Sequence, residues 1–200
     1  MSFDVNQFRA ALNGDGARPN LFQVNLHFPE FVNNSMASTI KNAFLCHGTS
    51  LPAATMQDQN VFYMGRQIPQ AGGLIYNPWN LQIYNDEDFM VRDALMAWMR
   101  GMSGDTTSTL RDVSAATMER YSVNASVIQY SKMGMPIKAY DMIGLFPIHV
   151  GEIQLSWQAN DQIEEFSADF RIQGYRENQG LVATAGAIAS SAIGILGQFL

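Results

Sequence analysis

The chain has 200 residues, a hydrophobic fraction of 47% and a charged fraction of only 15%, and its net charge is −6. This length suits one ordinary domain with extensions, and the low charged fraction hints at a surface that assembly partly covers. The negative charge disfavours binding to nucleic acid through phosphate contacts. The one cysteine, Cys46, excludes an intrachain disulfide and fits a reducing compartment. No secretory signal is expected, because no basic start followed by an apolar run opens the chain.

The N-terminal part of the chain is expected to contain an arm, a strand and an insertion. Residues 3–12 have loosely helical apolar spacing, which predicts a short helix or arm before a glycine-rich break. Residues 21–28 alternate between apolar and polar side chains and are expected to form a strand. Residues 29–42 look like an irregular insertion, and a short strand is expected around 43–47.

Residues 53–73 read as an extended loop that leaves the body of the domain. A strand is expected within it at 61–64, and Gly72-Gly73 is expected to provide a turn. The alternation of Trp79 with Leu81 and Ile83 predicts the next strand.

The clearest helix is expected at residues 86–100. Asn85 is the predicted N-cap, and the acidic side chains that follow it favour the positive end of a helix. Gly101 is the expected C-terminal glycine. The side chains expected on the apolar face are Val91, Ala94, Leu95, Trp98 and Met99.

The last third of the chain is expected to be mostly strand. A weak helix is expected at 110–118, and strands are expected at 121–127 and 137–143. Residues 144–175 carry the most regular alternation and predict a long hairpin with a turn at 159–162. The side chains expected to point inward from its two arms are Ile153, Leu155 and Trp157, and then Phe166, Ala168, Phe170 and Ile172.

These elements predict a mainly β fold, an antiparallel β-barrel or sandwich with one flanking α-helix and short terminal arms. The expected parts are an N-terminal arm at 1–20, a β-barrel domain at 21–176 and an apolar C-terminal extension at 177–200. Residues 181–200 carry no charge, and a membrane-anchored binding protein is therefore one alternative. Their glycines, their hydroxyl groups and the lack of a basic anchor favour an arm that packs on protein, so no membrane anchor is expected.

No catalytic, cofactor or metal site is expected. The three histidines are far apart in sequence, and Cys46 and His47 would point to opposite faces of a strand. Glu164 and Glu165 would also point to opposite faces, which excludes a paired-carboxylate glycosidase. An enzyme is disfavoured, and no cofactor is expected.

Several motifs, in order along residues 3–175, resemble the tail tube proteins of T4-like contractile-tailed phages. The matching motifs are ARPNLFQV at 17–24, TSLPA at 49–53, FYMGRQI at 62–68, Trp79 with NDE at 85–87, GLFP at 144–147 and VGEIQLSW at 150–157. Two segments depart from the family pattern: 29–42 looks longer, and the tail after Arg176 looks like an addition.

The resemblance implies a tail-tube or Hcp-like barrel, hexameric rings and a hollow tube of stacked rings inside a contractile sheath. It implies that sheath contraction drives the tube through the host envelope and that DNA passes down the lumen without specific binding. The implied partners are other copies of the chain, the sheath protein, a baseplate initiator and a tail terminator. The implied location is the virion, with assembly in the host cytoplasm. A tube protein of a related injection machine, type VI secretion or a contractile bacteriocin, is the alternative.

Three sets of residues are then candidates for contacts in such a tube. The lumen-facing candidates are Glu152, Glu164, Glu165 and Asp169, because residues 151–177 carry a net charge of −4. The candidates for contacts between stacked rings are Phe62, Tyr63, Met64 and Arg66. The sheath-facing candidates, chosen by elimination, are Asp88, Arg92, Asp93 and Arg100.

Overall fold

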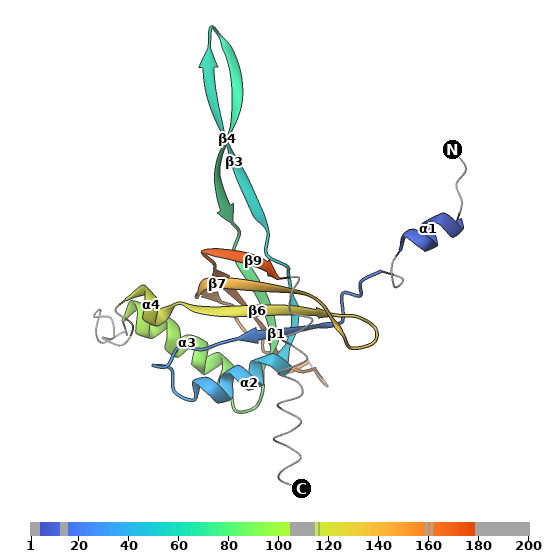
Figure 1. Cartoon of the computed structure of the whole chain (residues 1–200). Helices are drawn as coiled ribbons and strands as arrows, with labels where there is room; N and C mark the ends of the chain where they lie inside the picture. Colours follow the sequence, from blue (N-terminus) through green and yellow to red (C-terminus); the bar gives the residue numbers. More distant parts are fainter. Residues whose placement is uncertain are drawn as a thin grey trace.

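The fold is an open antiparallel sheet with two helices packed on one side and a long hairpin that projects from the body (Figure 1). The computed structural model describes residues 5–12, 16–104, 115, 117–158, 160 and 162–178. Its helices are α1 (Val5–Ala11), α2 (Ser35–Leu45), α3 (Met90–Ser103) and α4 (Met118–Tyr121). Its strands are β1 (Phe22–Leu26), β2 (Cys46–Thr49), β3 (Ala54–Tyr63), β4 (Arg66–Tyr76), β5 (Trp79–Tyr84), β6 (Val123–Tyr130), β7 (Pro136–Val150), β8 (Glu165–Arg171) and β9 (Gly174–Asn178).

The strand order of the main sheet is β1-β6-β7-β8-β5-β2, and β9 also pairs with β7. All pairs are antiparallel. The predicted mainly β, antiparallel fold class is confirmed. The barrel is not closed, however, because β1 and β2 lie at the two ends of the strand order. Each end strand therefore presents an edge to which a further strand can be added.

Strand β7 holds the two halves of this sheet together. Its first part pairs with β6 and β9, and its last part, from Phe146 onward, pairs with β8. The change of partner occurs at Gly144, whose φ of 66° lies in the left-handed region that favours glycine. The Gly144 N–H donates a hydrogen bond to Asn124 Oδ1 at 3.3 Å. Gly144 thus bends one continuous strand from one half of the sheet into the other.

The core lies between the concave side of the sheet and helices α2 and α3. The two buried tryptophans contact the same phenylalanine: the Phe170 ring lies 5.8 Å from Trp79 and 6.3 Å from Trp98. Both indole N–H groups are satisfied, one by the Ser50 carbonyl at 2.9 Å and the other by the Tyr121 carbonyl at 2.8 Å. The alternation predicted for residues 165–172 is confirmed, since Phe166, Ala168, Phe170 and Ile172 are all buried.

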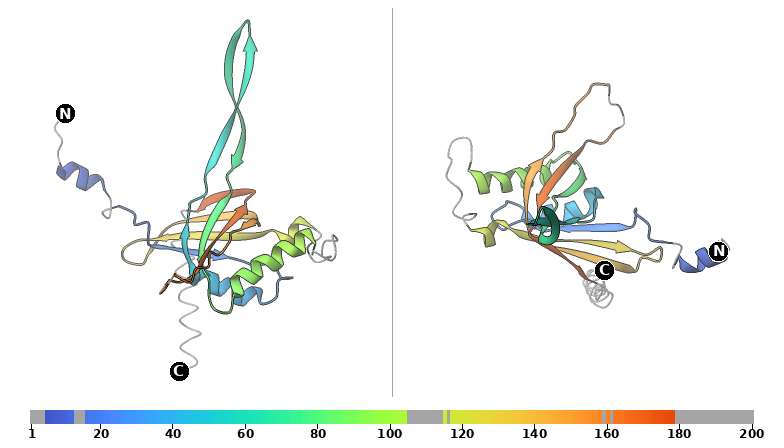
Figure 2. Two further views of the ribbon diagram at one scale, coloured as in Figure 1. Left: turned by 180° about the vertical axis from the view of Figure 1, so that it is seen from behind. Right: turned by 90° about the horizontal axis from the view of Figure 1, so that it is seen from above.

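The prediction that the first arm of the 144–175 hairpin is a strand is wrong beyond Val150, where β7 ends. Residues 151–158 form no strand and loop out from the body (Figure 2), and Leu155 and Trp157 are 78% and 107% exposed. The β7–β8 pairing ends at Val150 and Ala168. An alternating sequence satisfies its backbone as a strand only where a neighbouring strand exists, and within the described chain the contact with β8 goes no further than the Gly151 N–H, which donates to the Ser167 carbonyl at 2.7 Å. Of the three side chains expected inward, only Ile153 packs against the core.

The region predicted as an irregular insertion contains helix α2. The expectation of an irregular segment is wrong, and the helix is unusual in that the positions it buries completely, Ser38 and Asn42, carry polar side chains.

Helix α3 begins at Met90 rather than at residue 86, and Asn85 is not its N-cap. Phe89 occupies that position with a φ of 52° and without a side-chain capping bond. The acidic residues before the helix make other contacts: Asp86 accepts from the Glu87 N–H at 2.9 Å, and both Asp86 and Asp88 bind Lys41 on α2. These carboxylates therefore connect two helices. The C-cap of α3 is Gly104 rather than Gly101, and Gly101 lies inside the helix against the Phe31 ring.

The extended loop expected at 53–73 is a two-stranded hairpin, β3–β4. Its turn is Met64-Gly65, and both residues have positive φ, 45° and 77°, as in the two-residue turns that match strand twist. The turn predicted at Gly72-Gly73 is wrong. These glycines lie in β4 beside a register shift, where a Cβ on Gly72 would lie 2.8 Å from the Gln57 carbonyl oxygen.

Two predicted features lie mainly outside the described residues. Most of the weak helix expected at 110–118 falls on residues that the structure does not describe. Helix α4, which begins at Met118, is described. The apolar segment 181–200 lies wholly outside the described residues. Within the described part of the chain, none of the helices combines the length and apolar character that crossing a bilayer requires.

Candidate assembly surfaces

The β3–β4 hairpin presents apolar side chains to solvent along its whole length. Every residue of β3 is exposed, and at the tip Phe62, Tyr63 and Met64 are 72%, 63% and 89% exposed. Arg66 pairs with Tyr63 across the turn, so the structure brings all four predicted ring-stacking residues together at one end of the molecule. An isolated two-stranded hairpin is at best marginally stable in water, and a neighbour that covers it would stabilise it.

The two faces of the hairpin tip differ in chemistry. Directly paired residues share a face, which places Val61 with Ile68 and Tyr63 with Arg66 on one side. Phe62 and its partner Gln67 lie on the other side. The tip therefore carries an aliphatic and aromatic surface on one face and a single large aromatic anchor on the other.

The β8 and β5 side chains that point away from the core form a polar, acidic surface. Core-facing Phe166, Ala168 and Phe170 alternate with outward-facing side chains, as the pleat of a strand requires; the outward-facing ones are Glu165, Ser167, Asp169 and, at the end of the strand, Arg171. The neighbouring β5 adds outward-facing Asn80, Gln82 and Tyr84. This surface is called the acidic face below, together with Glu152 and Glu164.

Three of the four predicted lumen-facing acids surround one hollow. Glu152, Glu164 and Glu165 line an open depression of about 940 Å³ between β5, β8 and the 151–164 segment. Asp169 lies further along the same face of β8 and accepts a hydrogen bond from Asn80 Nδ2 at 2.7 Å. The structure therefore gathers these acids on one surface.

Two of these acids contact a neighbouring side chain: Glu164 contacts Asn85, and Glu165 contacts His47. Glu164 Oε2 accepts from Asn85 Nδ2 at 2.9 Å. Glu165 Oε2 lies 3.3 Å from His47 Nε2, and the His47 ring stacks on Tyr84 at 3.9 Å. Hydrogen bonds from an amide fix a carboxylate without neutralising it, so the surface stays acidic.

The predicted sheath-facing residues are not equivalent in the structure. Arg92 is half-buried: its Nη1 donates to the Gly151 carbonyl at 2.9 Å, and its guanidinium lies 5.3 Å from the Phe166 ring centroid. Asp88 binds Lys41. Asp93 and Arg100 are exposed on α3. Asp88 is exposed as well, so Arg92 is the candidate whose side chain is turned toward the body.

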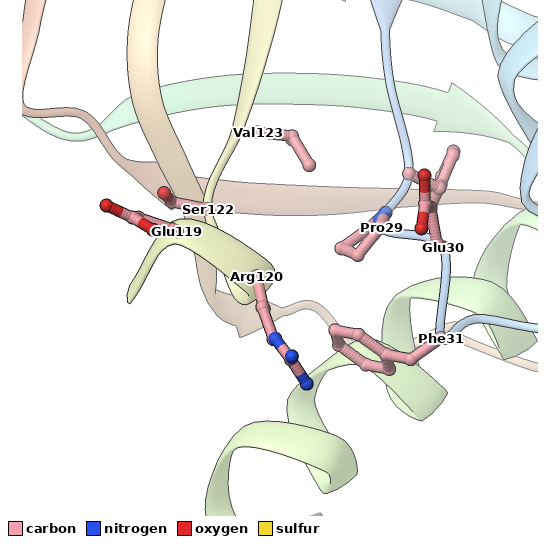
Figure 3. Close-up of a pocket in the computed structure, with 8 residues that line it drawn as sticks. Pro29, Glu30, Phe31, Glu119, Arg120, Ser122 and Val123 are labelled. Carbon is pink, nitrogen blue, oxygen red and sulfur yellow. The ribbon is translucent and has the colours of Figure 1, made fainter. Parts of the chain in front are cut away.

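A further hollow, of about 690 Å³, lies between α4 and the loop after β1 (Figure 3). Glu30 and Glu119 lie on its two sides, with Arg120 and Phe31 along one edge. Its described lining residues include no histidine or cysteine that could act as a nucleophile or base with these groups. In the part of the chain that the structure describes, no three His, Cys, Asp or Glu side chains are arranged to hold a metal ion.

Sequence reasoning missed two exposed apolar groups. One is Leu155, Trp157 and Ile163 in the segment between β7 and β8. The other is Met36, Ile40 and Phe44 on the outer side of α2, at 78%, 58% and 82% exposure. The i, i+4, i+8 spacing of the second group was available in the sequence, but it resembles the spacing of a buried helix face.

An open sheet with free edges, a projecting apolar hairpin and several exposed apolar groups define a class of protein: a structural subunit that is completed by its neighbours.

Comparison with known proteins identifies the family. The sequence model described as "Phage tail tube protein" matches residues 17–178. The tail tube protein gp19 of Enterobacteria phage T4 is 31% identical over 159 residues, which cover 79% of this chain and 90% of that protein. The chain belongs to the phage tail tube protein family. It is a structural subunit of a tail tube and not an enzyme.

Solved structures of contractile injection systems share the fold. A chain in the cryo-EM structure of the anti-feeding prophage baseplate gives a TM-score of 0.55 at 16% identity, and the match covers 81% of this chain and 95% of that chain. A chain in the sheath–tube complex of the extracellular injection system PVC, in its extended state, gives 0.51 at 10% identity, covering 89% and 99%.

Proposed function

We propose that this chain forms hexameric rings that stack into the hollow tube of a contractile phage tail, through which DNA leaves the virion. The observation that carries this proposal is the β3–β4 hairpin, which projects from the body with Phe62, Tyr63 and Met64 exposed at its tip. Exposed apolar surface of this extent is a cost to a monomer and a source of binding energy in a stack.

Within a ring, the free edges of the open sheet provide the contacts. Among the described strands, β2 pairs with β5 alone and β1 with β6 alone, so each presents one side that no described strand pairs with. Residues 152–158 alternate as a strand does but pair with no strand in the part of the chain that the structure describes. Adding such a segment to the edge of a neighbour satisfies its backbone and covers Leu155 and Trp157.

The acidic face is assigned to the lumen. DNA that passes through a tube must not adhere to the wall, and carboxylates repel phosphates where lysine or arginine would bind them. The partners in this proposal are the sheath protein, against Asp93 and Arg100 on α3, and a baseplate initiator and a tail terminator at the tube ends. The assembled location is the virion, after assembly in the host cytoplasm.

The first test is negative-stain electron microscopy of the purified chain over a concentration series, with and without the baseplate initiator. The wild type is expected to form hollow tubes. The triple variant Phe62→Ser, Tyr63→Ser, Met64→Asn keeps a turn residue that tolerates positive φ and is expected to stop at single rings. The control, Met133→Ser with Met135→Ser, removes equally exposed methionines from another turn and is expected to form tubes. A wild type that stays monomeric under all conditions contradicts the proposal.

Cysteine labelling tests which surface faces the lumen. In assembled tubes, Glu152→Cys is expected to react with a small maleimide but not with a polymer-linked maleimide that is too bulky to enter the tube. Asp93→Cys is expected to react with both reagents. The native Cys46 does not interfere, because it is buried, and burial raises its pKa to about 12. Reaction of Glu152→Cys with the bulky reagent overturns the lumen assignment.

A tube of a related injection machine is the second candidate, favoured by the fold similarity to the anti-feeding prophage and PVC chains. Particles that contain DNA distinguish a phage tail from such a machine.

A further inference from the structure

Helix α2 has its polarity reversed relative to an ordinary surface helix. It buries Ser38 and Asn42 completely against the body, and their side-chain oxygen and nitrogen atoms lack a hydrogen-bond partner. On the opposite side it exposes Met36, Ile40 and Phe44, which form one stripe. This stripe, called the α2 stripe, spans about 12 Å at 1.5 Å per residue.

Helix α2 cannot hide this stripe by rotating about its own axis. Lys41, beside the stripe, binds the carboxylates of both Asp86 and Asp88 on the segment that leads into α3. A rotation that turned Phe44 inward would break both contacts and expose the Lys41 side of the helix to a different neighbour. Burial of the α2 stripe therefore requires another segment to cover it.

Helix α1 also exposes an apolar side. Its seven residues include none that is buried, and it stands apart from the body in both views (Figures 1 and 2). Helices of this length are unstable alone in water and depend on packing. Val5, Phe8 and Leu12 fall on one side at 69%, 66% and 38% exposure, and Leu12 continues the helical bonding through its N–H to the Phe8 carbonyl. This α1 stripe spans about 10 Å.

We propose that the α2 stripe is the docking site for α1 of a second copy of this chain. The two stripes match in length and in apolar character, and the side chains of both are exposed in the part of the chain that the structure describes. Charge is also complementary: Arg9 lies beside the α1 stripe, and the segment beside the α2 stripe carries Asp86, Glu87 and Asp88 against Lys41, a net charge of −2. Opposite charges at the rim of an apolar contact orient the two helices.

The proposal rests on self-assembly of the chain, which places a second copy within reach. In the assembled tube, α1 would tie one subunit to the next in addition to the hairpin contact. The α1 helix would become ordered on the neighbour, and the exposed apolar area of both stripes would be removed from water.

Disulfide trapping between differently tagged chains tests this contact. Phe8→Cys is placed in a chain with one tag and Ile40→Cys in a chain with another, and the two are mixed, assembled into tubes and oxidised. A disulfide-linked product that carries both tags is expected, at about tenfold or more the yield of a control mixture in which Met133→Cys replaces Ile40→Cys. The native Cys46 stays silent because it is buried and protonated.

A second measurement separates docking from folding. Phe44→Gln changes an exposed side chain, so the melting temperature of the monomer is expected to stay at the wild-type value. The concentration needed for tube formation is expected to rise about tenfold or more, since burial of a phenylalanine is lost. Phe8→Gln is expected to have the same effect, and the double variant is expected to be no worse than either single one, because both remove one contact.

The outcomes separate this inference from the proposed function. Tubes that form without the two-tag product overturn the inference alone, as does a disulfide found only within one chain in the Phe8→Cys, Ile40→Cys double variant. Phe44→Gln tubes that form normally but fail to bind sheath protein overturn it in favour of a sheath contact. A wild type that forms no oligomer overturns both.

Discussion

Phe170 and Trp157 show how differently two aromatic residues of one predicted hairpin contribute to the molecule. Phe170 is fully buried between Trp79 and Trp98, whereas Trp157 is fully exposed. Both lie at positions that alternation predicts to face inward. Phe170 lies on a strand with neighbours on both sides, and Trp157 lies on a segment that has no partner strand in the described chain.

This difference predicts opposite results for two truncations. Phe170→Ala leaves a cavity between two tryptophans and is expected to lower the free energy of unfolding by about 3–5 kcal/mol. Trp157→Ala is expected to leave the stability of the monomer unchanged but to weaken assembly. Urea unfolding, followed by circular dichroism, measures the first effect, and sedimentation measures the second. An equal loss of monomer stability in both variants would show that the 151–158 segment packs on the body.

The positive φ of Gly144 predicts the effect of placing a side chain at this position. Its φ of 66° is costly for any residue with a Cβ, and a Cβ there would lie 2.5 Å from Gln173 Cδ. Gly144→Ala is expected to lower the free energy of unfolding by about 1–2 kcal/mol from backbone strain, since the Gln173 side chain can move away. The control is Gly73→Ala, where φ is not positive and the space is open. A similar urea midpoint for Gly144→Ala and wild type would refute this account of the bend in β7.

The contact between helices α2 and α3 depends on charge. Lys41 on α2 donates to Asp86 and Asp88, and the hydrogen bond from Lys41 holds the pKa of Asp88 below its ordinary value of 3.8. A carboxylate with a lowered pKa in the folded state contributes stability above its unfolded pKa. That contribution is lost as the pH falls through the lower, folded pKa.

Asp88→Asn is therefore expected to melt below the wild type at pH 7. The difference in melting temperature is expected to shrink as the pH falls below about 3.8, where wild-type Asp88 takes up a proton. Asp93→Asn removes the same charge from α3 and leaves the Lys41 contacts in place. If the two variants follow the same pH dependence, the effect comes from net charge rather than from the Lys41 contact.

Helices and strands whose apolar side chains are buried within the same domain could be predicted from the sequence. Strand β8 and the buried residues of α3 are such cases, because each buries one regular apolar face within the domain. The orientation of helix α2 could not be predicted: Met36, Ile40 and Phe44 have the spacing of a buried helix face, yet they are exposed and the helix buries polar side chains instead. The β3–β4 turn was misplaced because two adjacent glycines are a stronger turn signal than Met64-Gly65, although they lie beside a register shift.

The candidate surfaces were predictable only in part, for a related reason. The acidic content of residues 151–177 pointed to Glu152, Glu164 and Glu165, but strand alternation accounts only for the outward position of Glu165, because Glu152 and Glu164 lie outside β8. The inward position of Arg92 depends on Gly151 and Phe166, which are distant in sequence. Residues that a neighbouring subunit covers are apolar at the same spacing as residues buried within one chain. Leu155 and Trp157 therefore look like core residues in the sequence of a single chain.

At the scale of the whole molecule, the exposed apolar segments predict where a protease will act. Chymotrypsin is expected to cleave the unassembled chain at Phe62 or Tyr63 and near Leu155 or Trp157, since these side chains are exposed. In tubes both regions are expected to be protected, because neighbours cover them. Mass spectrometry of the fragments identifies the sites. Equal cleavage rates before and after assembly would contradict the assignment of these regions to interfaces.

The order of strands in the sheet has a consequence for synthesis of the chain. Strand β8 connects β5 and β2 to the rest of the sheet, and the bonded pair Asn80 and Asp169 is 89 residues apart in sequence. At about 5–20 residues per second, a ribosome needs roughly 4–18 seconds to add this length. During that time the nascent β2–β5 pair lacks β8, the strand that hydrogen-bonds it to β7 in the described sheet, although α2 already contacts β1, β2 and β5. A chain whose translation stops before β8 thus cannot present both edges on one continuous sheet, which keeps truncated products out of a growing polymer.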